Sequence, residues 1–417
     1  MPHPDYRPYL PLPGQSKIAG PTARAHADAR RQSPRAREFF AGWEKLLAVP
    51  FRGITTDGTV IPDLYTRAPN GAPAAAMIEA IQALSNLLSP EQRARMSFPV
   101  DSSHWRRWQN TELYLEDYGL RLDEVPDPIR AAAMAVLRAG LSAKGYEMSR
   151  DVMRLNRFLG DLVGGPQVLG EWSFTFCLFG TPSLAEPWGW QLFGHHLSLN
   201  CFLLGEQMVL SPTFWGAEPS YADVGPFAGT KLFEDEEREG LALIHSLSPE
   251  EQRRAIVAHS MVGGDLPPGR RHFADNLHLA GAHQDNRVIP YEGIKVGDLA
   301  PAQRRHVLDL IGCYIAPLPA GPNKARMEEI ERHLADTHFC WIGGTGEDST
   351  FYYRVQSPVV LIEFDHHIGV FLTNAEPAKF HVHTIVRTPN GNDYGFDLLR
   401  QHYEEAPHHR RQDQARP

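Results

Sequence analysis

The sequence predicts an α+β fold with a largely antiparallel, strand-rich core. Three observations support this class: helical patterning in the N-terminal half, alternating aromatic-rich segments at about 171–217 and 337–388, and helical segments inserted between them. The 417 residues, 42% of them apolar, are enough to bury a large core without disulfides. The four cysteines form no CxxC pair, so we expect buried reduced thiols.

We expect one main structural unit. Residues 1–20 are rich in proline and predict a flexible N-terminal segment that lacks the long apolar stretch of a usual signal peptide. Residues 21–403 form a single α+β unit, in which 21–165 are helical and 171–403 are strand-rich. Residues 404–417 are expected to be a flexible tail.

The predicted helices follow from apolar spacing and from start signals. Ser89 and Ser248 each precede proline and glutamate, which is the pattern of an N-cap followed by a first helical turn. The helical segments are 23–47, 74–88, 129–141, 150–163, 233–247, 248–259, 300–316 and 324–335.

The predicted strands occur in two blocks. In the first block, 171–179, 188–204 and 208–214 alternate as strands of an antiparallel meander, with a turn at 205–207. The second block contains 339–342, 351–356, 359–365, 369–372 and 380–386. Both blocks place a Phe-Cys pair and a glycine ahead of a histidine pair, which indicates either an internal duplication or chance.

Three histidine clusters lie in these strands. In the first, we expect His196 to share a face with Ser198 and Asn200, while His195 faces the core unless Gly194 forms a bulge. We therefore favour His196 as the functional member of this pair. The alternative is a hydrogen-bonded structural pair.

The second cluster combines acids with histidines. Glu363, Asp365 and His367 alternate onto one face of a strand, and His366 lies on the other. Carboxylate oxygens and imidazole nitrogens both bind cations, so this strand end is a candidate metal site. The alternative is a solvated polar strand end.

The third cluster is His381-Val382-His383, whose i, i+2 spacing places both imidazoles on one face of a strand. Together the three clusters provide the candidate metal ligands His195, His196, Asp365, His366, His367, His381 and His383. They supply enough nitrogen and oxygen ligands for a divalent metal, zinc or iron, with a position open for water or substrate.

Other side chains are candidates for completing an active site. Glu218 and Glu363 are possible general bases, and Arg387 is a candidate for binding a substrate carboxylate. Trp188 and Trp190 line an apolar pocket in one interpretation and belong to the core in the other. The polar and aromatic run at 104–110 is a possible roof over that pocket.

The remaining patterns exclude several classes. The net charge of −9 is spread along the chain, which argues against nucleic acid as a main partner. No apolar run approaches the ~18 residues of a membrane span, so we expect a cytoplasmic protein without a membrane partner. The chain lacks GxSxG, GxxxxGK[ST], GxGxxG after a strand, and HExxH.

Four long motifs are similar to those of a known family. The runs PWGWQLFGHHLSLN, SPTFWGAEP, FYYRVQSPVVLIEFDHHIGV and HVHTIVRTPNGNDYG resemble the DUF3500 family, a domain of unknown function, over roughly 51–403. The resemblance implies one unit rather than two separable modules. It assigns no role to the histidines.

The sequence therefore favours a metal-dependent enzyme that acts on a small organic molecule, with hydrolysis by metal-activated water as the first choice. A non-haem iron or copper oxidoreductase is the second choice, because two histidines and one carboxylate form the ligand set of iron oxygenases. A non-catalytic small-molecule or metal-binding protein is the third. Homo-oligomerisation stays open.

Overall fold

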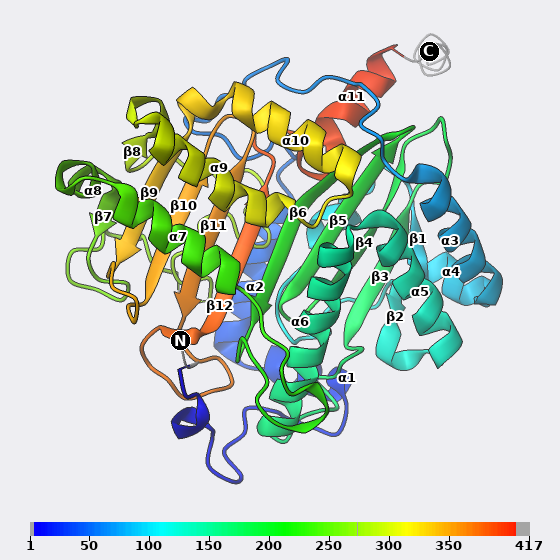
Figure 1. Ribbon diagram of the computed structural model, residues 1–417. Coiled ribbons are helices and arrows are strands. Elements are labelled where there is room, and N and C mark those ends of the chain that lie inside the picture. Colours follow the sequence, from blue (N-terminus) through cyan, green and yellow to red (C-terminus); the bar gives the residue numbers. More distant parts are fainter. Residues whose placement is uncertain (1–3, 273, 406–417) are drawn as a thin grey trace.

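The computed structural model describes residues 4–272 and 274–405. Within them, eleven α-helices surround a twelve-stranded mixed sheet that is mostly antiparallel, which confirms the α+β class (Figure 1). The main path of the sheet runs β1-β3-β4-β5-β6-β12-β11-β10-β9-β7, while β2 pairs with β3 and β8 with β9. In this part of the chain, no helix combines the length and apolar character that a membrane crossing needs.

The elements up to the centre of the sheet are α1 (Ala23–Arg31), α2 (Pro34–Leu47), α3 (Ala74–Leu87), α4 (Pro90–Met96), β1 (Ser97–Phe98), β2 (Leu120–Arg121), α5 (Asp127–Gly140), α6 (Ala143–Leu162), β3 (Phe174–Phe179), β4 (Trp188–Gly194), β5 (Leu197–Leu204) and β6 (Gln207–Ala217). The following elements are α7 (Glu234–Ser246), α8 (Pro249–Ala255), β7 (Ile256–Ala258), β8 (Ile294–Lys295), α9 (Pro301–Ile315), α10 (Ala320–Arg332), β9 (His338–Gly343), β10 (Phe351–Gln356), β11 (Leu361–His367), β12 (Ala378–Arg387) and α11 (Phe396–Glu405).

The same order of elements occurs twice. From α3 to β6 the chain forms two helices, two short strands, two helices and a four-stranded meander, and α7 to β12 repeats that series. In each half the first short strand pairs parallel to the first strand of the meander and the second pairs antiparallel to it. The topology therefore supports an internal duplication and extends it to the helices, with the two repeats meeting where β6 pairs antiparallel with β12.

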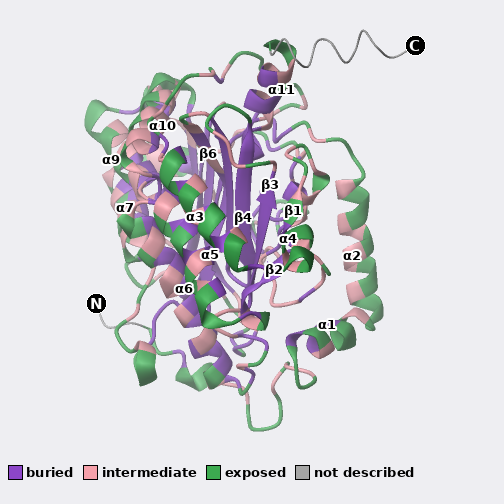
Figure 2. Cartoon of the chain, turned by 90° about the vertical axis from the view of Figure 1, so that its right-hand side faces the viewer, coloured by how far each residue is buried: buried purple, intermediate pink, exposed green. Residues whose placement is uncertain are grey.

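The two faces of the sheet are covered differently. Helices α6, α7, α9 and α10 lie across one face, which we call the helical face (Figure 1). Helix α2 lies on the opposite side, the loop face, at the outer edge of the molecule (Figure 2). On the loop face, Trp105, Trp108 and Leu279 form a second core with Phe214 of β6 and Ile385 of β12. Long connections rather than helices therefore cover much of the loop face.

Local start signals are confirmed. Ser89 and Ser248 each form a capping box, in which the serine accepts from the backbone N–H three residues on and that residue's side chain accepts from the serine N–H. These caps begin α4 and α8, the corresponding helices of the two repeats. Their reciprocal hydrogen bonds satisfy backbone donors that have no partner within the helix.

Three expectations differ from the structure. Residues 188–204 are two strands, because a two-residue turn at His195-His196 joins β4 to β5. Residues 369–372 form no strand, since their N–H groups turn toward a carboxylate. Most of residues 4–20 are exposed, but Tyr6 is fully buried and donates to Asp223 Oδ1 at 2.6 Å. Of the segments expected to be flexible, 1–3 and 406–417 lie outside the described residues.

Candidate metal centre

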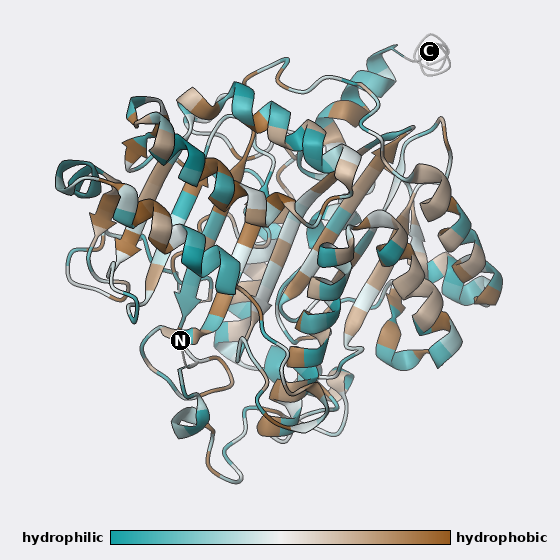
Figure 3. Cartoon of the chain, in the orientation of Figure 1, coloured by the Kyte–Doolittle hydropathy of each residue, from teal (hydrophilic) through white to brown (hydrophobic). Residues whose placement is uncertain are grey.

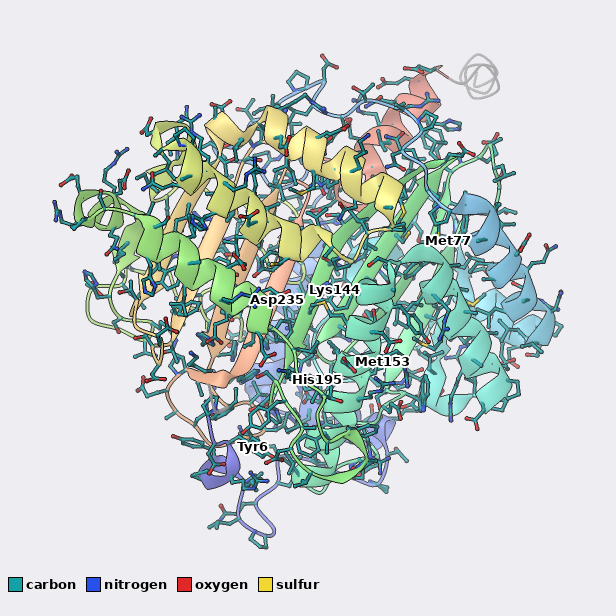
Figure 4. The ribbon with its side chains drawn as sticks, in the orientation of Figure 1. Tyr6, Met77, Lys144, Met153, His195 and Asp235 are labelled. Carbon is teal, nitrogen blue, oxygen red and sulfur yellow. The ribbon has the colours of Figure 1, made fainter. Side chains whose placement is uncertain are left out.

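The candidate site lies where the two repeats meet, at one end of the central strands. It is formed by the β4–β5 turn, the end of β6, the end of β11 and the first half of β12. Hydrophilic residues interrupt the hydrophobic ones along these buried strands (Figure 3). Figure 4 places His195 at this end of the sheet, beside the lower part of α6.

His381 and His383 are held by the period of β12. Residues two apart on a strand face the same side, and both rings are buried, with 0% and 5% of their surfaces exposed. Their Nε2 atoms are 3.1 Å apart. Two nitrogens on a tetrahedral metal with bonds of 2.0–2.1 Å lie about 3.3–3.4 Å apart, so this separation suits a shared ion.

His196 brings the third imidazole from the other repeat. It occupies the second position of the β4–β5 turn with φ +64°, a left-handed conformation that is uncommon for a residue with a side chain. Its carbonyl accepts from Gly216 N at 2.8 Å, which fixes the turn on β6. The ligand atoms of His196, His381 and His383 all lie within 4.8 Å of one another. We call these three residues the histidine triad.

Gly216 makes room for the triad. It pairs with His383 across β6 and β12. A Cβ atom at this position would lie 3.0 Å from Cδ2 of His196 and 3.0 Å from Cδ2 of His383. The absence of a side chain therefore lets the two rings approach from opposite sides.

His195 supports the triad from the helical face. Its ring stacks on His196 with centroids 3.8 Å apart, and its Nδ1 lies 2.7 Å from Oδ1 of Asn156 on α6. The amide of Asn156 donates to Gly170 O, so its oxygen faces His195 and accepts from Nδ1–H. This bond fixes the tautomer of His195 and positions the ring behind His196.

The adjacent histidines His366 and His367 face opposite sides. His367 packs on the triad, with its ring centroid 4.2 Å from that of His383, while its two nitrogens lie near the carbonyls of Ile368 and Ala274. His366 accepts from Phe351 N at 3.0 Å and packs among Phe351 and Phe364 on the helical face. The structure therefore removes His366 from the candidate ligands, because the pleat points it away.

Glu218 lies behind His381. Its carboxylate accepts from the N–H groups of Val370, Phe371 and Leu372 at 2.8–3.2 Å, and Oε1 is 3.7 Å from His381 Nδ1. Burial raises the pKa of Glu218 to about 7, although the three N–H groups partly offset that effect. This geometry makes Glu218 a positioning group for His381, in contact with the ring edge that faces away from His383.

Burial keeps the imidazoles neutral. It lowers the pKa of His196, His381 and His383 well below the usual value, with neighbouring imidazoles adding to the effect. Burial also lowers the pKa of His195 and His367 to about 4. Neutral imidazole is the form that binds a metal, so the triad is ready for a cation at neutral pH without releasing protons.

Asp365 and His278 extend the site along the loop face. Asp365 pairs with His383 across β11 and β12, and its Oδ1 lies 3.5 Å from His278 Nε2. Both side chains are buried, and neither carboxylate oxygen nor His278 Nε2 has a hydrogen-bond partner among the described residues. Burial raises the pKa of Asp365 well above the usual value. Unpartnered buried polar groups are rare, and here they adjoin the triad.

Glu363 and Arg387 form hydrogen bonds to other protein groups and do not take the general-base and substrate-binding roles expected from the sequence. Glu363 accepts from Leu279 N, Ala280 N and the hydroxyl of Tyr352. These bonds anchor the loop that covers the sheet, so Glu363 has a structural role in place of the general-base role expected from the sequence. Although burial opposes ionisation of Glu363, nearby cationic groups lower its pKa.

Arg387 is fully buried, and its guanidinium donates to Asp285, Asp393 and the carbonyls of Ala280 and Gly281. Its donors are directed at the protein, which argues against a role in binding a substrate carboxylate.

The aromatic candidates divide between the two faces of the sheet. Trp188 and Trp190 are fully buried in the main core, so core packing is the correct interpretation for both. Trp105 and Trp108 pack on the loop face, and the carbonyl of Asn110 accepts from His196 N at 3.4 Å. The 104–110 run therefore covers the sheet beside the triad.

Sequence reasoning missed the segment that covers the loop face. Residues 270–272 and 274–285 contribute His278, the buried His283, and Arg270, whose Nε and Nη2 have no hydrogen-bond partner among the described residues. The dense polar string DNLHLAGAHQDN was the available signal. It has no strand or helix period, so it gave no spacing argument.

Fold and site together define an α+β protein of two structural repeats with a candidate three-histidine metal centre between them. The chain belongs to the family described as protein of unknown function (DUF3500), whose model matches residues 70–396. No curated protein and no solved structure matches the chain.

Proposed function

We propose that this protein is a metal-dependent enzyme that acts on a small organic molecule, most simply by hydrolysis with metal-activated water. The observation that carries the proposal is the convergence of His196, His381 and His383 from two repeats onto one buried point. Three histidines, with water or substrate as the fourth ligand, form a ligand set of catalytic zinc sites.

The surroundings of the triad support a catalytic rather than a purely structural site. Structural zinc sites are closed and often recruit thiolates, but Cys177 and Cys201 are buried elsewhere in the two cores. A divalent metal at the triad would lower the pKa of a bound water toward about 7. Asp365 and His278 adjoin the triad and face each other at 3.5 Å without a hydrogen bond among the described residues, which leaves both groups suited to contact water or substrate.

The second candidate is an iron or copper oxidoreductase. Its specific support is the donor set, because imidazoles suit copper and iron as well as zinc, and Asp365 lies across the strand pair from His383. The identity of the bound metal separates the two candidates.

The test is metal analysis of the purified full chain and of single variants. We expect close to one transition metal per chain in the wild type, and a loss of at least tenfold in metal occupancy for His196→Ala, His381→Ala and His383→Ala. His245→Ala is the matched control, because His245 is an exposed histidine on α7 that contacts Thr345 O, and it should retain the metal.

The outcomes are distinct. Zinc with hydrolysis of an ester or amide panel that is lost in His383→Ala supports the proposal, whereas iron or copper with oxygen uptake supports the second candidate. Metal-free protein that gains neither stability nor activity from added zinc, iron or copper contradicts a metal centre. A bound metal without turnover would leave a metal-binding protein in place of an enzyme.

A further inference from the structure

A second candidate ligand site lies on the loop face, separate from the histidine triad. It is a cavity of about 400 Å³ whose lining includes Phe40 and Trp43 of α2, Arg107 and His283. That volume lies within the range of small-molecule sites. The cavity and the triad share one wall segment, since Gln109 lines the cavity and the carbonyl of Asn110 accepts from His196 N.

His283 is the polar group that requires explanation. Its side chain is buried, with 5% of its surface exposed, yet neither Nδ1 nor Nε2 has a hydrogen-bond partner among the described residues. A neutral imidazole offers one donor and one acceptor, and leaving both unpaired costs free energy. Burial lowers the pKa of His283 to about 4, so the ring is neutral at pH 7. The His283 ring therefore lines the cavity with one N–H donor and one nitrogen acceptor available to a ligand.

Aromatic rings form the apolar wall. The ring of Trp43 lies 4.3 Å from that of His283, and Phe40 lies 5.4 Å from Trp43. All of α2 lacks fully buried residues, although it carries three aromatic side chains on adjacent turns. The C-terminal end of the helix is held by Arg106, which donates to the carbonyls of Leu47 and Val49. A helix that exposes part of an aromatic face over a cavity is suited to contact a flat ligand.

The charge of the lining favours an anion. Three arginines, Arg31, Arg37 and Arg107, and two glutamates, Glu44 and Glu116, line the cavity, which leaves one positive charge in excess. Both glutamates lie within 3.3 Å of an Arg107 nitrogen, so this one guanidinium offsets one of their two negative charges. The remaining positive charge comes from α1 and α2.

We propose that this cavity binds a small aromatic carboxylic acid, with its ring on Phe40 and Trp43 and its carboxylate accepting from the N–H of His283 and from the arginines. An apolar wall, an unpaired neutral donor and an excess of positive charge are the three features that such a ligand complements. Each feature alone suits many ligands, and their combination selects a ring that bears an acid.

The test is calorimetric titration of the full chain with benzoate, benzamide and acetate. We expect saturable binding of benzoate. Benzamide, which lacks the charge, and acetate, which lacks the ring, should each bind at least tenfold more weakly. Trp43→Leu and His283→Leu should each weaken benzoate at least tenfold. Trp43 is half-buried on α2, so its replacement leaves the fold intact, which thermal unfolding will verify.

Two controls separate this site from the metal centre. His245→Leu, at an exposed histidine on the other side of the sheet, should bind benzoate like the wild type. His383→Ala should also bind benzoate, because the cavity does not include the triad. Absence of saturable benzoate binding, equal binding of acetate, or unchanged binding in both Trp43→Leu and His283→Leu would overturn the proposal, whatever the metal content.

Discussion

Replacing Gly216 by alanine tests the metal centre without removing a ligand. The new Cβ would lie 3.0 Å from Cδ2 of His196, 3.0 Å from Cδ2 of His383 and 3.0 Å from the carbonyl of Val382. The optimum separation of non-bonded carbons is about 3.5–4.0 Å, so each ring must move by roughly 0.5 Å or more. Both rings are buried, and little space exists to receive them.

The magnitude follows from two tolerances. Overpacking one methyl in a close-packed region costs about 1–3 kcal/mol of unfolding free energy. Metal–ligand bonds tolerate changes of about 0.2 Å, so a shift of roughly 0.5 Å in two ligands exceeds what the site absorbs. We expect Gly216→Ala to weaken metal binding by about 10–100-fold, the range seen when groups that orient ligands are removed.

The assay is competition with a metal chelator, followed together with urea unfolding of the metal-free protein. The control is Gly312→Ala in α9, where, apart from its chain neighbours and the backbone of its own helix, no atom of the described residues lies within 4 Å of the added Cβ. This helical glycine should accept alanine with unchanged metal affinity and a gain of up to about 1 kcal/mol. A Gly216→Ala variant with wild-type metal affinity would refute the inference that the triad holds the ion.

Two further predictions concern stability. Burial raises the pKa of Glu236 to about 7 from 4.5, so the folded state binds the proton more tightly and Glu236 makes stability fall between pH 4.5 and 7. In urea titrations, the unfolding free energy of Glu236→Gln should therefore equal that of the wild type near pH 4.5 and exceed it by roughly 3 kcal/mol at pH 8. Equal stability of the two proteins at pH 8 would contradict the prediction. Arg387→Gln should cost about 3–5 kcal/mol, because Asp393 and Asp285 lose a buried partner; full stability with impaired turnover would instead restore the substrate role expected from the sequence.

Local signals predicted the elements well because they act within a few residues. The serine caps at Ser89 and Ser248 placed two helix starts, and the i, i+2 spacing placed His381 and His383 on one face. The alternation of β11 also separated His366 from His367. These features depend on helix and strand periods, which the sequence expresses directly.

Long-range features were beyond such signals. The β4–β5 turn contains His195 and His196 instead of the usual Asn-Gly or Asp-Gly pair, so the two strands looked like one. Arg387 has one nearby partner in the chain, Asp393, and one that lies more than 100 residues away, Asp285. Local spacing gives no indication of the distant partner Asp285. The covering segment 270–285 has no period, so its approach to the site is visible only in three dimensions.

The pairing of β6 with β12 has a consequence for how the site arises during folding. One imidazole of the triad belongs to the first repeat and two belong to the second, so the candidate metal site does not exist in either repeat alone. Docking of the two halves would thus have to precede the binding of any metal at the triad. A bound ion would in turn stabilise the association of the two repeats across the β6–β12 pair, because it would bind only the docked state.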